Sequence, residues 1–233
     1  MDDVRVLGVD ACRNGWLGIV LGGGAPAAHH ARAIGDLVAA AAGRAPLDVV
    51  AIDIPIGLPD TGRRQADLRA REAARPRWQS VFMTPVRQAL AAPDLASANA
   101  RSREINGTGI SAQAYALRTG ILQVDAWVRE TRLRVAEAHP EVSFARMAEL
   151  SGRPPVAGKK SWAGAHQRMA LLAAHGITLP ADLGGPGAAA GVDDVLDAAA
   201  AAWTARRIAR GDAECMPDPP EVFSDGLPCA IWV

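Results

Sequence analysis

An almost unbroken apolar run, Leu47–Ile56, most constrains what this chain can fold into. Its sequence LDVVAIDIPI is rich in β-branched residues, which favour strands. A strand that is apolar on both sides needs a cover on both faces of its sheet. The 233 residues, 49% of them hydrophobic, supply enough apolar side chains for such a core. The run therefore predicts a buried strand between two helical layers and excludes a disordered or fibrous chain.

Three further strands are predicted before this run. Val4–Asp10 is aliphatic and β-branched, Ala11–Gly15 is a polar turn, and Trp16–Leu21 is a second strand. Gly22–Gly24 supply the positive φ angles that a hairpin needs, and His29–Ile34 is the third strand. These strands predict an antiparallel meander at the start of the sheet.

The rest of the chain alternates between helical and extended patterns. Helices are predicted over residues 35–44, 63–77, 86–105, 113–133, 160–175 and 193–210. A fifth strand is predicted over Arg134–His139, where Pro140 stops it, and Val222–Val233 is predicted to return to the sheet. The order predicts one α/β domain, a mixed sheet in which parallel strands continue the meander and helices flank it.

Cysteine usage and the N-terminal residues exclude several classes of protein. The chain has three cysteines, Cys12, Cys215 and Cys229, and no two of them are spaced as Cys-x-x-Cys. This argues against a disulfide framework and a thiolate zinc finger. The chain begins with the acidic Met1–Asp3 where a signal peptide is basic, and no apolar run approaches the ~20 residues of a membrane span. We therefore expect a cytoplasmic protein with no membrane partner.

Charges balance in the whole chain but not along it. The 25 basic and 25 acidic residues give no net charge, which argues against a protein that coats nucleic acid nonspecifically. Residues 60–104 hold nine arginines and five acidic residues, whereas residues 193–225 hold eight acidic residues and three arginines. This asymmetry fits a site that combines cation-binding carboxylates with phosphate-binding arginines. The alternative is an arginine and alanine content that reflects a GC-rich genome and carries no function.

Carboxylates in hydrophobic strands are the main candidates for catalysis. Asp10 ends the first predicted strand, Asp53 lies within the fourth, and Glu137 lies near the end of the fifth. An ionised carboxylate in an apolar strand costs several kcal/mol unless a cation or a donor meets it. Each of the three carboxylates therefore either belongs to a binding site or has a structural role, in which it pairs with an arginine or caps a turn.

The last predicted helix adds further acidic residues. Asp193 and Asp194 suit the first turn of a helix, where they complement its dipole, but Asp197 lies beside an apolar run, residues 198–203. Two strand carboxylates with one or two from this helix would hold two Mg²⁺ or Mn²⁺ ions roughly 4 Å apart. Such a pair activates water and stabilises the leaving oxygen in phosphodiester cleavage. The candidate metal ligands are Asp10, Asp53 and Asp194.

Basic residues are candidate phosphate ligands. Arg64, Asp67 and Arg71 fall within one stripe of a predicted helix, where guanidinium forks could face a phosphate. A solvated helix face with internal ion pairs is the alternative. His139 could assist proton transfer, although a histidine before a proline is more typical of a structural residue. The candidate substrate-binding residues are Arg13, Arg63, Arg64, Arg71, Lys159 and Lys160.

Five ordered motifs resemble one known family over nearly the whole chain. They are Gly8–Trp16, Ile52–Pro59, Ser80–Pro85, Glu137–Phe144 and Asp193–Ala198. The family is called domain of unknown function 429, and its members are generally described as predicted nucleases of the ribonuclease H-like fold.

The resemblance implies roles for the acidic residues. Asp10 corresponds to the first-strand carboxylate of ribonuclease H-like enzymes and Asp53 to the fourth-strand carboxylate. Asp194 and Asp197 resemble the paired helix carboxylates of Holliday-junction resolvases, whereas Glu137 has no clear counterpart. The candidate catalytic residues are Asp10, Asp53, Glu137, Asp194 and Asp197. We expect a single ribonuclease H-like domain over residues 1–233 with a helical insertion at about 60–110, and a Mg²⁺- or Mn²⁺-dependent nuclease that acts on a nucleic acid or a nucleotide.

Two other classes of function are consistent with these residues. An ATPase-like module of the actin-like superfamily also uses an aspartate at a strand end, but it clamps its nucleotide between two copies of the fold. A chain of 233 residues without a repeat would need a homodimer for that. The other class is a non-catalytic protein that holds an anion through its arginines.

Overall fold

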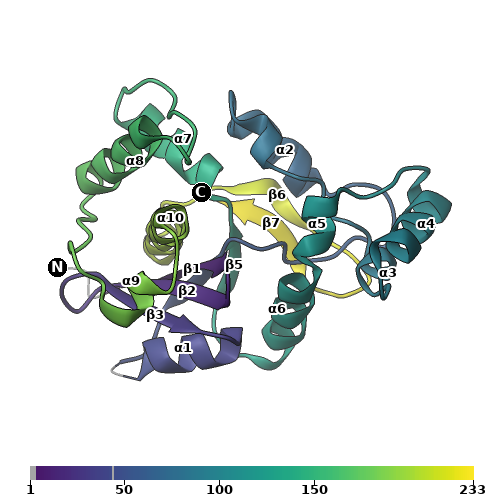
Figure 1. Ribbon diagram of the computed structural model, residues 1–233, viewed down its shortest axis with the longest axis horizontal. Helices are drawn as coiled ribbons and strands as arrows, with labels where there is room; N and C mark the ends of the chain where they lie inside the picture. Colours follow the sequence, from purple (N-terminus) through teal and green to yellow (C-terminus); the bar gives the residue numbers. More distant parts are fainter. Residues whose placement is uncertain (1–3, 44) are drawn as a thin grey trace.

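The computed structural model describes residues 4–43 and 45–233, and a seven-stranded mixed sheet lies at its centre (Figure 1). In chain order the strands are β1 (Val6–Cys12), β2 (Gly15–Leu21), β3 (Ala27–Ala31), β4 (Val49–Ile52), β5 (Val135–Ala138), β6 (Cys215–Val222) and β7 (Pro228–Trp232). Their order in the sheet is β3-β2-β1-β4-β5-β7-β6. β1 to β3 form the predicted antiparallel meander, and β4, β5 and β7 run parallel to β1. This α/β architecture confirms the predicted mixed sheet and is consistent with a ribonuclease H-like arrangement.

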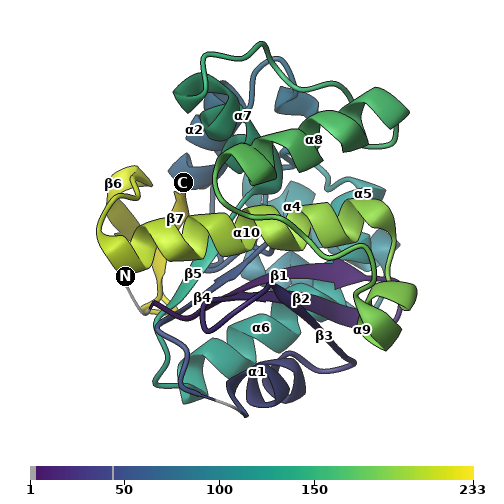
Figure 2. The ribbon, with the colours of Figure 1, turned by 90° about the vertical axis from the view of Figure 1, so that its left-hand side faces the viewer.

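Helices cover both faces of the sheet (Figure 2). On one side lies α10 (Val192–Arg210), against which α7 (Pro140–Leu150) and α8 (Trp162–Ala174) pack. On the other side lie α1 (Ile34–Ala42) and α6 (Arg118–Glu130). No helix in the described part of the chain has both the length and the apolar character that crossing a membrane requires.

Small residues bring α10 unusually close to β1. The side chains of residues 198–202 are all alanines and are fully buried. A Cβ atom at Gly8 would lie 1.9 Å from the backbone nitrogen of Ala202, so that only glycine fits there. Because strand residues alternate between faces, Gly8 and Asp10 face α10, whereas Leu7 and Val9 face the opposite layer. The end of β1 therefore lies beside the first turns of α10.

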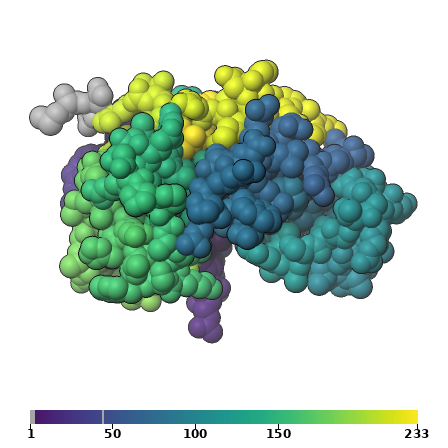
Figure 3. Space-filling model, turned by 90° about the horizontal axis from the view of Figure 1, so that it is seen from above, coloured from purple at the N-terminus to yellow at the C-terminus, as the bar shows by residue number. Residues whose placement is uncertain are grey.

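The long connection between β4 and β5 carries most of the remaining helices. They are α2 (Gln65–Ala73), the 3₁₀ helix η1 (Trp78–Ser80), α3 (Arg87–Leu90), α4 (Leu95–Asn106), α5 (Ala112–Ala116) and then α6. α2 packs against β6 and β7 at the edge of the sheet. Figure 3 shows the blue segment that contains α2 side by side with the green segment that contains α7 and α8. The expected insertion at about 60–110 covers α2 to α4, and the division into one domain with this insertion stays a prediction.

Several predicted elements have different bounds in the structure. The helix predicted over 86–105 is divided into α3 and α4, since Pro93 cannot donate and Asp94 starts a new helix by accepting a hydrogen bond from the Ser97 backbone nitrogen at 2.8 Å. The helix predicted over 113–133 is likewise divided into α5 and α6. The central strand ends at Ile52, one residue before Asp53.

The elements α7, β6 and α9 (Gly184–Ala188) were not predicted. Pro140 does end β5, but it also begins α7, because a helix does not need the amide hydrogen that proline lacks at its first position. β6 contains three prolines and lies at the edge of the sheet, where missing donors are tolerated. α9 is a short turn in a glycine-rich segment without helical periodicity.

Candidate functional site

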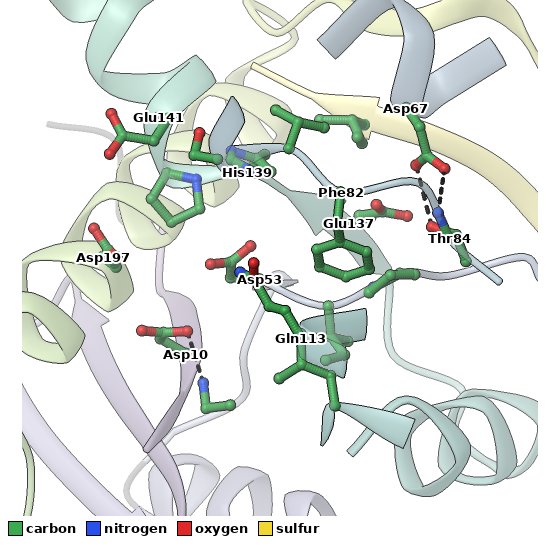
Figure 4. A pocket seen from close by; sticks show the side chains of 18 of the residues that line it. Asp10, Asp53, Asp67, Phe82, Thr84, Gln113, Glu137, His139, Glu141 and Asp197 are labelled. Atoms are coloured by element: carbon green, nitrogen blue, oxygen red, sulfur yellow. Dashed lines mark hydrogen bonds between the residues drawn. The ribbon is translucent and has the colours of Figure 1, made fainter. Parts of the chain in front are cut away.

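The register of the central strands brings Asp10 and Asp53 together. Val9 of β1 pairs with Ile52 of β4, and the Asp53 backbone nitrogen donates to the Val9 carbonyl oxygen at 2.8 Å. Parallel strands end at the same edge of a sheet, so that the two carboxylates that follow these positions are neighbours. Asp197 approaches from the second turn of α10. One carboxylate oxygen of each aspartate lies within 4.8 Å of the others (Figure 4).

The three carboxylates are poorly satisfied inside the protein. Asp10 accepts a hydrogen bond from the Ala11 backbone nitrogen at 2.7 Å, and Asp197 accepts one from the Lys159 ammonium at 2.6 Å. Asp53 is half-buried, and its carboxylate accepts no hydrogen bond from residues 4–43 or 45–233. One ammonium thus faces three carboxylates, which leaves an excess of negative charge in a site where Asp10 and Asp197 are buried.

Burial and this excess of charge together shift the pKa of every member of the group. Burial raises the pKa of Asp10 and of Asp53 well above the ordinary value, and the neighbouring aspartates raise both further. Burial also raises the pKa of Asp197, against the opposing effect of Lys159. Burial alone would disfavour the Lys159 ammonium, but Asp197, Asp10 and Asp53 raise the pKa of Lys159 above its ordinary value. The cluster therefore favours added positive charge, whether from protons or from a cation.

The raised pKa values predict how bound metal and pH together affect stability. Carboxylates with raised pKa values in the folded state contribute stability that is complete below about pH 4 and is lost as the pH rises through the folded pKa. Mg²⁺ binds the deprotonated carboxylates. The rise in melting temperature that 5 mM Mg²⁺ causes is therefore expected to grow between pH 5 and pH 8. Differential scanning fluorimetry with Mg²⁺ or EDTA across this range measures it, and an effect that is constant with pH would contradict the expectation.

The aspartates open into a cavity of about 270 Å³. Ligand-binding cavities commonly measure about 300 to 1,000 Å³, so this one suits a compact group. Phe82 and Gln113, both from the connection between β4 and β5, lie opposite the carboxylates, and His139 and Glu141 lie at the start of α7 (Figure 4). The connection between β4 and β5 therefore supplies the second wall of the cavity.

Glu137 lies at this cavity but belongs to a separate, self-contained network. Arg64 is fully buried and donates to Glu137 at 2.7 and 2.9 Å, to Asp67, and to the carbonyl oxygens of Ile56 and Gly57. The second oxygen of Glu137 also accepts from the Ile56 backbone nitrogen at 2.8 Å. All three nitrogens of Arg64 already donate to acceptors inside the protein, which argues against the phosphate-binding role predicted for it, and that role stays a prediction.

The network fixes the wall that faces the aspartates. Asp67 accepts hydrogen bonds from the backbone nitrogen and the hydroxyl of Thr84, at 2.7 and 3.2 Å. Thr84 follows Phe82 in the motif Ser80–Pro85. Glu137, through Arg64 and Asp67, thus connects the end of β5 to the loop that carries Phe82, which is a positioning role.

The remaining predicted residues lie at different distances from the carboxylates. Asp194 lines the same cavity, but one of its oxygens accepts from the Gly191 backbone nitrogen at 3.0 Å and caps α10. Lys159 contacts Asp197 directly, whereas Lys160 is exposed. Arg13 is exposed in the turn between β1 and β2. Arg63 and Arg71 line a second cavity, which shares Phe82 and Thr84 with the first.

His139 lines the aspartate cavity as a neutral side chain. Burial, with a smaller effect from Lys159, lowers its pKa to about 4. Its Nδ1 atom is buried and has no hydrogen-bond partner among the described residues. At neutral pH the imidazole therefore carries no charge into the site.

Sequence reasoning missed Phe82, Gln113 and Glu141 as residues of the cavity. Phe82 lies in Ser80–Pro85, one of the motifs that carry the family resemblance, so the sequence offered a reason to consider it. Glu141 lies in the first turn of a helix that was not predicted, where it accepts a hydrogen bond from the buried Arg168 at 2.7 Å. Nothing in the sequence distinguished Gln113, since polar residues are common at the start of a helix.

Comparison with known proteins identifies one family. The family described as "Protein of unknown function (DUF429)" matches residues 8–222. No curated protein and no solved structure gave a significant match to the chain. Because the match covers nearly the whole sequence, and includes both strands and the helix that carry the three aspartates, the chain belongs to the DUF429 family.

Proposed function

We propose that the protein is a metal-dependent phosphodiester hydrolase that acts on a nucleic acid. The observation that carries this proposal is the convergence of Asp10, Asp53 and Asp197 from three separate elements to within 4.8 Å at the wall of a cavity. One ammonium, that of Lys159, contacts this group of three carboxylates, and a further cation would offset the remaining negative charge, because an isolated buried charge costs several kcal/mol.

The donor set fits Mg²⁺ or Mn²⁺. These ions prefer oxygen ligands, and Mg²⁺ is commonly held by one or two carboxylates with water and substrate phosphate completing its shell. Asp53 is the most available ligand, because its carboxylate has no hydrogen bond to the described residues. Asp194 lines the same cavity and would serve a second ion. When bound, such ions supply an activated water and stabilise the leaving oxygen.

The protein's own residues would prepare the site for this chemistry. Lys159 holds a positive charge beside Asp197 and favours the entry of an anionic phosphate. Phe82 and Gln113 limit the width of the cavity opposite the aspartates and would orient the substrate. His139 keeps a neutral imidazole at neutral pH and adds no charge that would compete with the metal. A cytoplasmic location and a homodimer stay predictions.

A direct assay tests this function. The purified protein is incubated with Mn²⁺, Mg²⁺ or EDTA and with labelled single-stranded DNA, duplex DNA, RNA, an RNA–DNA hybrid and a four-way junction. We expect cleavage of at least one substrate that requires the metal, and a loss on the order of 10³-fold in the variant Asp10→Asn. Asp36→Asn, an exposed carboxylate on α1, is the matched control and should cleave normally.

Two outcomes would contradict the proposal. If every substrate stays intact in Mn²⁺, the protein is not a nuclease. If Asp10→Asn binds nucleic acid as well as the wild type or better and neither protein turns it over, a non-catalytic protein that binds anions is the class that remains.

A further inference from the structure

A second cavity of about 250 Å³ lies next to the aspartate cavity. The two share part of one wall, because Phe82 and Thr84 line both of them. The far side of the second cavity is formed by the end of α4 and by residues 106–111. The two cavities are therefore neighbours, and a ligand long enough to occupy both would contact Phe82.

The charge of the second cavity is opposite to that of the first. Arg63 and Arg71 line it, and no acidic residue is among its lining residues in the described part of the chain. Arg63 is exposed and forms no hydrogen bond or ion pair with the described residues. Among the residues that the structure describes, Arg71 donates a hydrogen bond only through its Nε, to the Val81 carbonyl oxygen at 2.8 Å, and its guanidinium lies over the ring of Trp78. With respect to residues 4–43 and 45–233, both terminal amino groups of Arg71 and the whole guanidinium of Arg63 therefore remain available for a ligand.

The cavity is held in shape without any ligand. Asn106 both donates to and accepts from the backbone of Gly62, at 3.2 and 2.8 Å, so that the segment before α2 is fastened to the end of α4. Ser102 is buried and donates to the Thr108 carbonyl oxygen at 2.7 Å. Thr84, on the shared wall, is fixed by Asp67. These bonds fix the backbone around the cavity, and Arg71 is held by its bond to Val81, so that this donor would bind an anion at a smaller entropic cost than a mobile one.

We propose that the second cavity binds a backbone phosphate of the substrate, next to the phosphodiester that enters the aspartate cavity. Guanidinium forks match the oxygens of a phosphate in a bidentate manner. The carboxylate-lined cavity and the arginine-lined cavity are neighbours. They suit a ligand with repeated phosphates, of which one would bind the metal and the next would bind Arg63 and Arg71. The substrate is then a polynucleotide and not a mononucleotide. This inference rests on the proposed function.

Arg63 offers the clearest test, because its removal breaks no hydrogen bond or ion pair with the described part of the chain. The variants are Arg63→Gln and Arg63→Glu, and the control is Arg69→Gln, an exposed arginine on α2 outside both cavities. The probe is a fluorescein-labelled oligothymidylate of 12 nucleotides, and its binding is measured by fluorescence anisotropy in EDTA and in Ca²⁺. We expect Arg63→Gln to weaken binding about tenfold and to reduce the slope of log affinity against log salt by about 0.7, one phosphate contact to a single strand. Arg69→Gln should bind as the wild type does.

A second experiment measures the kinetics of hydrolysis. For Arg63→Gln, kcat/KM for the oligonucleotide is expected to fall about tenfold relative to kcat/KM for bis(4-nitrophenyl) phosphate, which has a single phosphodiester.

Competition against the labelled probe separates the sources of phosphate. Unlabelled oligothymidylate should displace the probe at far lower concentration than thymidine 5′-monophosphate or inorganic phosphate does.

The outcomes separate this inference from the proposed function. Equal binding by the wild type, Arg63→Gln and Arg63→Glu overturns the second phosphate site, and so does an equal loss in Arg69→Gln. Displacement by the mononucleotide as readily as by the oligonucleotide overturns the polynucleotide assignment. If no substrate is cleaved but Arg63→Gln selectively weakens binding, the phosphate site stands and hydrolysis fails. If cleavage needs metal and the Arg63 variants behave as the wild type, hydrolysis stands and the second site fails.

Discussion

Replacing Asp53 with asparagine is expected to stabilise the metal-free protein while abolishing its metal-dependent hydrolysis. Asp53 lies beside Asp10 and Asp197, and its raised pKa shows that its charge is disfavoured in the folded state. Removing that charge relieves its repulsion by the neighbouring carboxylates and should raise the free energy of unfolding at pH 7 by an amount on the order of 1 kcal/mol. The same change removes the most available metal ligand, and we expect hydrolysis to fall on the order of 10³-fold.

Denaturation by urea with and without Mn²⁺ measures both effects. A ligand that binds only the folded state stabilises it by mass action, so that Mn²⁺ should stabilise the wild type and have little effect on Asp53→Asn. Asp36→Asn, in a helix on the other face of the sheet from α10, should stay within about 0.5 kcal/mol of the wild type in both conditions. A metal-free Asp53→Asn protein that is less stable than the wild type would show that the carboxylate has a favourable partner, and the metal-site proposal would fail.

Replacing Arg64 with methionine is expected to cause a larger change in stability than the Asp53 substitution, and in the opposite direction. Arg64 is fully buried and is shared by Glu137 and Asp67, which are buried as well. Removing one partner from a buried ion pair costs about 3 to 5 kcal/mol, because it leaves charges without compensation. Arg69→Met, at an exposed position of α2, the helix that Arg64 precedes, is the control and should change the free energy of unfolding by less than about 0.5 kcal/mol.

The pH dependence identifies the cause of this loss. Burial already raises the pKa of Glu137 with Arg64 in place, and without the guanidinium it should rise further. A carboxylate whose folded pKa is raised adds stability below its unfolded pKa of about 4.3, and this stability is lost as the pH rises through the folded pKa. The deficit of Arg64→Met should therefore shrink as the pH falls from 7 to 5. Adding Glu137→Gln and Asp67→Asn to the Arg64→Met protein removes the charges that Arg64 compensated and should recover part of the stability. If these changes lower the stability further at every pH, the loss in Arg64→Met comes from packing and not from charge.

The sequence by itself determined the meander, the central parallel strands and the positions of Asp10 and Asp53. These follow from local properties: β-branched runs form strands, and neighbouring parallel strands end at one edge, so that charges at their ends must meet. Asp197 was also recognisable, since it interrupts an apolar run of the last helix. The chain order of these elements sufficed for one α/β domain with a mixed sheet, whereas the ribonuclease H-like expectation came from the resemblance of five motifs to the DUF429 family.

Only the tertiary structure decided how α10 is rotated, and therefore that Asp197, more than Asp194, joins Asp10 and Asp53. Two residues three positions apart on a helix share a broad face, and their order along the chain does not say which one points at the sheet. That choice depends on the contact of Gly8 with Ala202 and on the buried alanines beside it. The same holds for Arg64, whose sequence suggested a phosphate ligand. Its partners Glu137 and Asp67 become neighbours only when β5 and α2 pack together, because charge pairing across the fold depends on distances that local sequence does not contain.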